Sequence, residues 1–237
     1  MKTSRRSFLK QISALSAAPF MLPSSIWGAD TKPNDKIVMG FIGMGKQSRG
    51  LLGAFLQHQR CQVVAVCDVD TTRREDAHQR VNKFYSDRPD RGSADCAAYV
   101  DFREIIDRDD INAVCIATPD HWHAIQVIAA LESGKDVYCE KPLTHNIHES
   151  VAIINAVKAN NRVLQTGSMQ RSMEEFRVAC ELVRNGAIGK ISRVECSFGP
   201  PGVPCDLPGE EMEPGLDWDM WVGPAPMVPY QDNMIHY

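Results

Sequence analysis

A short glycine-rich loop is the first feature of the chain with residues suited to chemistry. It reads Gly43-Met44-Gly45-Lys46-Gln47-Ser48 and directly follows an apolar run. The spacing fits G-x-G-x-x-G with serine in the third position, so Gly43 would permit a tight turn and Gly45 would let the backbone approach a pyrophosphate. Ser48 is small enough for close helix–strand packing, and the N–H groups that open the next helix would bind phosphate oxygens.

An acidic residue follows the loop at the distance expected of a ribose ligand. Asp68 comes directly after a second apolar run, residues 62–67, and its carboxylate would accept hydrogen bonds from the adenosine ribose hydroxyls. Because a carboxylate there would repel the 2′-phosphate of NADP, NAD is the expected cofactor. Arg73 and Arg74 follow closely and could accommodate a phosphate, so NADP stays as the alternative.

A third group of polar residues follows another apolar run and reads Thr118-Pro119-Asp120-His121-Trp122-His123. The carboxyl edge of a parallel sheet is where open α/β folds bind ligands, so the Thr118-Pro119 turn should lie against the cofactor and His123 should line the site. Asp120 is expected to cap the next helix. Since His121 and His123 would not share a helix face, and no acidic or cysteine partner stands nearby with ligand spacing, no metal site is predicted.

The ordered set of motifs resembles one family. The glycine loop, the acid after the second strand, T-P-D-H-W-H and the Glu140-Lys141-Pro142 turn are similar to the Gfo/Idh/MocA oxidoreductases, which include glucose–fructose oxidoreductase and inositol dehydrogenase. The similarity runs from about residue 36 to the end of the chain, and residues 218–224 resemble a tryptophan-glycine-proline stretch of exported, sugar-related members. The resemblance implies an NAD(P)-dependent oxidoreductase that moves a hydride between nicotinamide and a sugar, polyol or glycoside carbinol.

The resemblance also implies roles for individual residues. Lys141 corresponds to the family's catalytic lysine beside the nicotinamide and the reacting carbinol, where an amine can exchange a proton with the substrate hydroxyl. Glu140 would orient that lysine or a ribose hydroxyl, and Gln170 and Arg171 fall where the substrate-facing wall begins. The predicted cofactor-binding residues are Gly43, Met44, Gly45, Gln47, Ser48, Asp68, Thr118, Pro119, His123 and Glu140.

One departure from the family pattern is large. Family members carry a second catalytic cluster, an aspartate and a histidine a helical turn apart, in a β-rich domain, and this sequence ends at Tyr237 without a match. The alternative is therefore a truncated or split member that binds nucleotide without turnover. Relatives that are NAD-dependent glycosidases tend to lack the E-K-P lysine, so net dehydrogenation is favoured. A full-length relative is expected to form a homo-oligomer through the sheet of that second domain.

Strands and helices alternate through the part of the chain that holds these motifs. The near-continuous apolar runs are typical of parallel strands buried on both faces, and six βα units predict an α/β fold with a doubly wound Rossmann sheet. The predicted strands are residues 36–42, 62–67, 98–100, 112–117, 136–139 and 162–166. The predicted helices between them are residues 48–58, 72–84, 102–108, 122–133 and 148–160.

The pattern changes after Gly167. An amphipathic helix over residues 173–184, an alternating strand over 190–198 and a proline-rich loop predict the start of an incomplete α+β second domain, since these elements cannot bury a core of their own. The predicted organisation is a signal segment over residues 1–30, a dinucleotide-binding domain over 31–167 and this second domain over 168–237.

The N-terminus is similar to a twin-arginine export signal. Ser4 to Lys10 read S-R-R-S-F-L-K, and residues 12–29 carry no charge. Interior Ser and Pro residues argue against a membrane span. The expected partner is the twin-arginine export machinery and the expected location is the periplasm, while Trp27 leaves the cleavage site open.

Composition excludes some classes of protein. The formal net charge of −4 offers no basic field to a phosphate backbone, so a nucleic-acid partner is not expected. Of the eight cysteines, Cys67, Cys115 and Cys139 fall in or beside buried strands, and no C-x-x-C pair occurs. We read them as small buried thiols and not as a disulfide framework.

Overall fold

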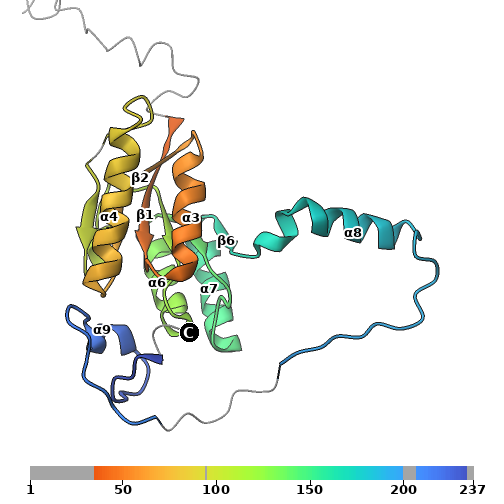
Figure 1. Ribbon diagram of the computed structural model, residues 1–237. Helices are drawn as coiled ribbons and strands as arrows, with labels where there is room; N and C mark the ends of the chain where they lie inside the picture. The colour runs from red at the N-terminus through yellow and green to blue at the C-terminus, as the bar shows by residue number, and fades with distance from the viewer. Residues whose placement is uncertain (1–34, 94, 200–206, 234–237) are drawn as a thin grey trace, which may run out of the picture. The chain divides into compact units, whose positions relative to one another are not determined.

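The computed structural model describes residues 35–93, 95–199 and 207–233. The predicted signal segment and its twin-arginine motif lie outside these residues. From Ile37 onward, strands and helices alternate as the apolar pattern predicts (Figure 1).

Six parallel strands form one sheet in the order β3-β2-β1-β4-β5-β6. This is the order of a doubly wound Rossmann fold, in which the chain winds outward from β1 and then crosses to β4 on its other side. The strands are β1 (Ile37–Ile42), β2 (Cys61–Cys67), β3 (Ala97–Tyr99), β4 (Ala113–Ile116), β5 (Asp136–Cys139) and β6 (Leu164–Thr166). The predicted fold class is confirmed, and each strand lies within one or two residues of its expected bounds.

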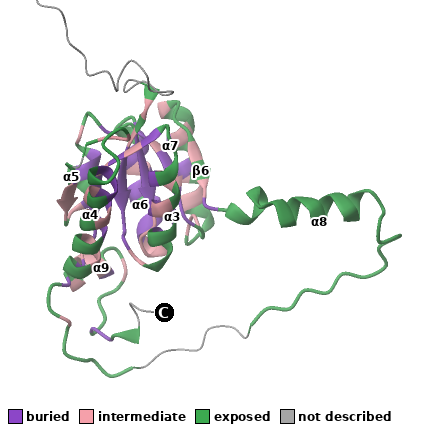
Figure 2. Cartoon of the chain, turned by 45° about the horizontal axis from the view of Figure 1, so that its top comes forward, coloured by how far each residue is buried: buried purple, intermediate pink, exposed green. Residues whose placement is uncertain are grey.

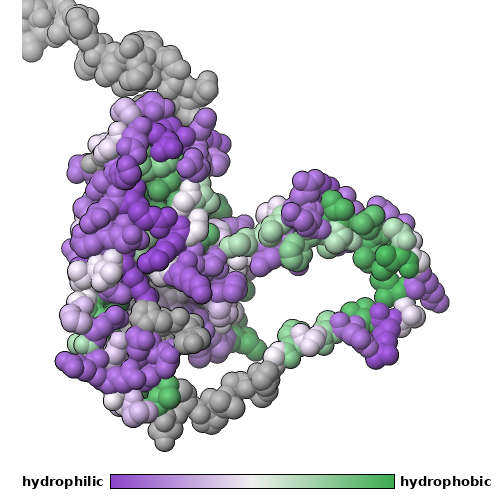
Figure 3. All heavy atoms as spheres, in the orientation of Figure 1, coloured by the Kyte–Doolittle hydropathy of each residue, from purple (hydrophilic) through white to green (hydrophobic). Residues whose placement is uncertain are grey.

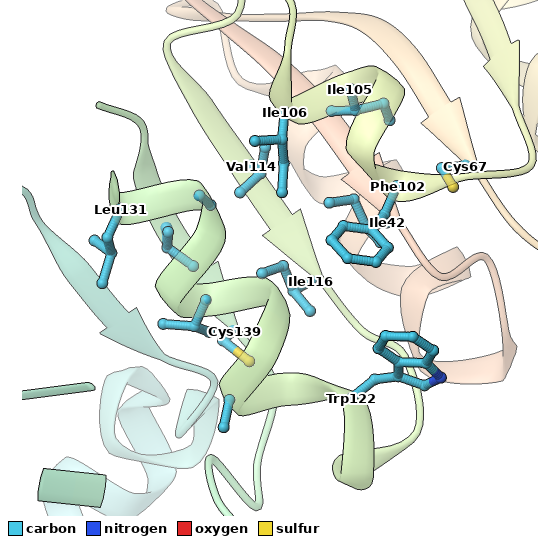
Figure 4. Close-up of a cluster of buried hydrophobic side chains, with 14 of the residues drawn as sticks. Ile42, Cys67, Phe102, Ile105, Ile106, Val114, Ile116, Trp122, Leu131 and Cys139 are labelled. Carbon is cyan, nitrogen blue, oxygen red and sulfur yellow. The ribbon is translucent and has the colours of Figure 1, made fainter. Parts of the chain in front are cut away.

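The helices cover both faces of the sheet. One apolar cluster joins the sheet to α3 and α4, and a second joins its opposite face to α5, α6 and α7. In Figure 4 the second cluster extends from Leu131 to Trp122, with Ile116 and Cys139 between sheet and helix. These helices are α3 (Lys46–Gln57), α4 (Thr71–Ser86), α5 (Phe102–Ile106), α6 (Asp120–Glu132) and α7 (Ile147–Asn160).

Burial on both faces explains the cysteines. Cys67, Cys115 and Cys139 are buried free thiols, as the sequence predicted, and Cys61 and Cys96 are buried as well. Burial raises the pKa of the Cys139 thiol to about 12, because a thiolate is poorly solvated between strand and helix. Cys180 and Cys196 are exposed.

The chain beyond β6 is different. A short 3₁₀ turn, η2 (Met169–Ser172), leads to the predicted amphipathic helix, α8 (Glu174–Arg184). Every residue from 168 to 199 is exposed, and Figures 2 and 3 show α8 exposed with apolar side chains at the surface. The prediction of a strand over residues 190–198 is wrong, because these residues form no strand in the structure. Alternation of apolar residues does not hold a strand extended without a neighbour to bond with, and these exposed residues have none in the described part of the chain.

The described chain ends with a return to the Rossmann domain. A one-turn helix, α9 (Trp218–Val222), begins at Asp217, whose carboxylate accepts a hydrogen bond from Met220 N at 3.0 Å. No helix among the described residues is both long enough and apolar enough to cross a bilayer.

Candidate functional site

A cleft of about 830 Å³ opens at the carboxyl ends of β1, β2 and β4. In a doubly wound sheet this is the place where the strand order reverses and where ligands bind. The cleft brings together most of the predicted cofactor-binding residues from three separate loops. Those that line it are Gly43, Gly45, Gln47, Asp68, Thr118 and Pro119.

The glycine loop comes very close to the loop after β4. Gly43 has φ of 84°, and a Cβ there would lie 2.7 Å from Thr118 N, so both backbone conformation and space require glycine. Gly45 is the N-cap of α3 and contributes no side-chain cap, which leaves the first-turn N–H groups facing the cleft for an anion. Met44 and Ser48, two of the predicted cofactor contacts, have buried side chains that serve packing; Met44 belongs to the loop and Ser48 to the first turn of α3.

Asp68 is held in place by the backbone on either side of it. Its Oδ2 accepts a hydrogen bond from Met44 N at 2.6 Å, and its Oδ1 accepts one from Asp70 N at 2.8 Å. Burial raises the pKa of Asp68, while these two N–H donors and the nearby Arg73 lower it. Each carboxylate oxygen keeps a second lone pair for a ribose hydroxyl. The geometry fits an adenosine ribose at this position.

Arg73 and Arg74, the two arginines that kept NADP as an alternative cofactor, make different contacts. Arg73 lines the cleft, and its Nε lies 3.1 Å from Asp70 Oδ2. Arg74 donates from Nη1 to the main-chain oxygen of Asp68 at 2.9 Å. Asp68 and Asp70 therefore place two carboxylates beside Arg73, which favours NAD over a cofactor with a 2′-phosphate.

The loop after β4 confirms some expectations and corrects one. His121 and His123 have different partners, as the helical spacing predicts: His121 Nε2 lies 3.0 Å from Trp221 O, whereas His123 lies between Thr118 O and Pro142 O. Asp120 was expected to be the helix cap, but Pro119 is the N-cap and Asp120 is the first helical residue. The proline ends the preceding loop in an extended conformation, which moves the start of α6 one residue earlier than the acid would need to cap it.

His123 is buried, and it joins two loops of the site. Its Nδ1 lies 2.8 Å from Pro142 O and its Nε2 lies 2.8 Å from Thr118 O. The sequence predicted that His123 lines the site. In the structure its buried ring instead holds the turn after β5 against the turn after β4.

Glu140 connects the catalytic turn to the glycine loop. Its buried carboxylate accepts hydrogen bonds from Gln47 Nε2 at 3.2 Å, from Tyr138 Oη at 3.4 Å and from Lys141 N at 3.2 Å. Burial and the neighbouring Glu140 raise the pKa of Tyr138 to about 12, which keeps that hydroxyl a donor. A Cβ on Gly167 would lie 2.6 Å from Glu140 Oε1, so glycine is needed for the carboxylate to fit.

The predicted substrate residues lie at the open side of the same edge. Lys141 follows Glu140 and is exposed. Gln170 and Arg171 belong to η2, shortly after β6, and are exposed too. All three therefore follow β5 or β6 at the carboxyl edge, on the far side of β4 from Asp68. Groups of His, Cys, Asp and Glu able to hold a metal ion are absent from the described residues.

One element of the site was missed in the sequence. Residues 213–222, which we call the strap, return to the cleft and contribute Glu213, Leu216, Met220 and Trp221 to its lining. The tryptophans of this segment were read only as a family feature of the second domain. Trp122 contacts the strap, since its indole N–H donates to Met220 O at 3.1 Å. The two residues are about a hundred positions apart, so local spacing in the sequence does not predict this contact.

The sheet order, the glycine loop on α3 and the ribose-binding carboxylate define a dinucleotide-binding domain of the Rossmann class. Residues 37–168 match the model of the oxidoreductase family with the NAD-binding Rossmann fold, Gfo/Idh/MocA. The chain belongs to this family, and NAD is the cofactor that the family fold binds.

Relatives fall into two activity groups. The chain is 29% identical over 216 residues to a glycosyl hydrolase family 109 protein of Shewanella pealeana, covering 84% of this chain and 46% of that protein. It is 40% identical over 106 residues to inositol 2-dehydrogenase of Rhodococcus erythropolis, covering 44% of this chain and 31% of that enzyme. The chain spans about half the length of the Shewanella relative.

A solved structure agrees with the fold. Scyllo-inositol dehydrogenase from Lactobacillus casei, with bound NAD(H) and scyllo-inositol, matches with a TM-score of 0.57 at 25% identity. The match covers 66% of this chain and 43% of that one.

Proposed function

We propose that the chain is the cofactor-binding part of an exported NAD-dependent oxidoreductase that acts on a sugar or polyol carbinol. The observation that carries this proposal is the hydrogen bond from Gln47 to Glu140, which ties the Glu140-Lys141 turn to the dinucleotide loop. The inositol dehydrogenase relatives support a polyol-like substrate.

The residues of this chain would divide the reaction between them. NAD, when bound, supplies the hydride acceptor. The N–H groups opening α3 would hold its pyrophosphate, and Asp68 its adenosine ribose. The Lys141 amine would take the hydroxyl proton of the carbinol as the C–H electron pair leaves, giving a carbonyl product. Glu140 would orient the turn that carries Lys141.

A second candidate is an NAD-dependent glycosidase. It is favoured by the family 109 relatives, because their similarity covers more of this chain than that of the dehydrogenases. The presence of Lys141 favours net dehydrogenation, since the resemblance associates that lysine with dehydrogenases.

Production of NADH separates the two candidates. The chain joined to a complete family-type second domain should form NADH with a member of a panel of sugars, polyols and glycosides, because hydride transfer needs the carbinol held against the nicotinamide. The chain by itself should show little turnover with the same panel. Hydrolysis of an aryl glycoside without NADH accumulation would instead support the glycosidase. Robust NADH formation by residues 1–237 alone would contradict the need for a second domain.

Export should depend on both arginines of the N-terminal motif. Replacing Arg5 and Arg6 with lysine keeps the charge but removes the paired guanidinium groups, so a fused reporter should stay in the cytoplasm. Replacing Lys10 with arginine in the same fusion is the matched control and should leave export unchanged. Equal periplasmic reporter signal from the double variant and the parent would rule out the twin-arginine route.

A further inference from the structure

We infer that the strap, residues 213–222, closes the adenosine half of the cleft and retains the bound dinucleotide. The inference rests on the proposed cofactor site and adds to it a wall from outside the Rossmann domain. It is carried by the position of the strap, which spans the cleft from the loop after β2 to the start of α6.

One end of the strap is anchored beside the ribose-binding loop. Thr71 donates twice to Gly215 O, from its backbone N at 3.0 Å and from Oγ1 at 2.8 Å. Asp217 N donates to Val69 O at 3.1 Å, and Asp70 forms an isolated antiparallel bridge with Leu216. Gly215 has φ of 87°, and a Cβ there would lie 3.1 Å from the Thr71 side chain. This anchor begins at Val69, directly after Asp68, so it fixes the strap at the adenosine end.

The other end is anchored on the start of α6. Trp122 Nε1 donates to Met220 O at 3.1 Å and to Trp221 O at 3.2 Å. The ring of Trp221 stacks on Trp218 with centroids 4.7 Å apart and meets His121 edge-on. Gly223 has φ of 51°, and a Cβ there would overlap the Trp122 ring. Trp122 is itself buried against Phe102, so the anchor is attached to the core.

Four residues of the strap line the cleft: Glu213, Leu216, Met220 and Trp221. The side chains of Leu216, Met220 and Trp221 give this part of the cleft an apolar wall, which suits the adenine ring more than the charged pyrophosphate. Because both ends are hydrogen-bonded across the cleft, the adenosine can leave past the strap only when an anchor opens. Such a closure lowers the rates of association and dissociation together, and its contacts with adenine lower dissociation further.

Retention would matter for an exported enzyme. A cofactor bound in the cytoplasm must survive transport, since free dinucleotide is scarce outside. A strap that slows release would retain the cofactor during transport without any change in the residues that bind the phosphates or the ribose.

The release rate of NADH from the purified chain tests the strap. Bound NADH is chased with excess NAD, and the loss of its fluorescence is followed by stopped flow. Gly223→Ala should raise the dissociation rate at least about tenfold. Thr71→Val, which removes the Oγ1 hydrogen bond to Gly215 O and the one that Oγ1 accepts from Arg74 Nη2, both outside the cleft lining, should raise it about threefold. Gly186→Ala is the matched control: its φ is 77° and its Cβ would meet no atom within 4 Å, so its rate should equal the parent's.

The double variant Gly215→Ala/Gly223→Ala attacks both anchors and should release NADH fastest. A rate within about twofold of the parent in this variant would overturn the inference. Failure of the folded parent to bind NADH at all is a different result, because it contradicts the cofactor site and with it the proposed function.

Discussion

Replacing Lys141 with alanine is expected to lower turnover at least about a hundredfold in the chain joined to a complete family-type second domain. The reason is the loss of the group that takes the carbinol proton, and a lost general base costs a factor on this scale. NAD affinity should change much less, because Lys141 is exposed beyond Glu140 and is not part of the cleft that holds the dinucleotide. The measurement is the steady-state rate of NADH formation together with NAD affinity by calorimetry.

Lys158→Ala is the control for this result. Lys158 is an exposed lysine near the end of α7, so its loss removes the same charge away from the site. Turnover of the Lys158 variant should match the parent. Parent-like turnover of the Lys141 variant would remove Lys141 from the catalytic assignment.

Replacing Asp68 with alanine is expected to weaken NAD binding by about 1.5–3 kcal/mol, which is a factor of roughly ten to 150 in the dissociation constant. Two effects add: the ribose loses a charged acceptor, and Met44 N loses the partner that holds the glycine loop. Calorimetry on the purified chain measures the loss.

Asp68→Asn separates these effects. The amide keeps the size and one acceptor oxygen but removes the negative charge, so NADP should gain on NAD in relative affinity. Asp90→Ala, an exposed carboxylate in the loop after α4, should leave both affinities unchanged. An unaltered NAD dissociation constant in Asp68→Ala would show that the ribose lies elsewhere.

Local patterns were sufficient for the Rossmann domain. The strands β1, β2 and β4 are apolar runs, and each loop residue of the site follows one of them at the same edge of the sheet. Gly43, Asp68 and Thr118 could therefore be placed together from the sequence. Their spacing along the chain is set by the βα units, in which one strand alternates with one helix.

The contacts that cross between loops could not be predicted in the same way. Gln47 meets Glu140, His123 bridges two turns, and Gly223 packs on Trp122 only because the fold brings distant segments together. The error over residues 190–198 has the same origin: alternation reports a preference for an exposed and a buried face, while pairing depends on a neighbour that the pattern does not contain.

For the export proposed above, the buried thiols favour folding of the chain before transport. Cys115 and Cys139 lie in neighbouring strands with raised thiol pKa values, so in the folded protein little thiolate forms and oxidants have no path to it. In the unfolded chain the same sulfurs are free to pair wrongly in an oxidising compartment. Export of the unfolded chain would therefore risk incorrect disulfides. A chain that folds first in a reducing compartment has these thiols buried in the sheet before it meets an oxidant. Among the described residues, Cys180 and Cys196 are exposed after the sheet, so such a passage would leave their sulfurs open to oxidation.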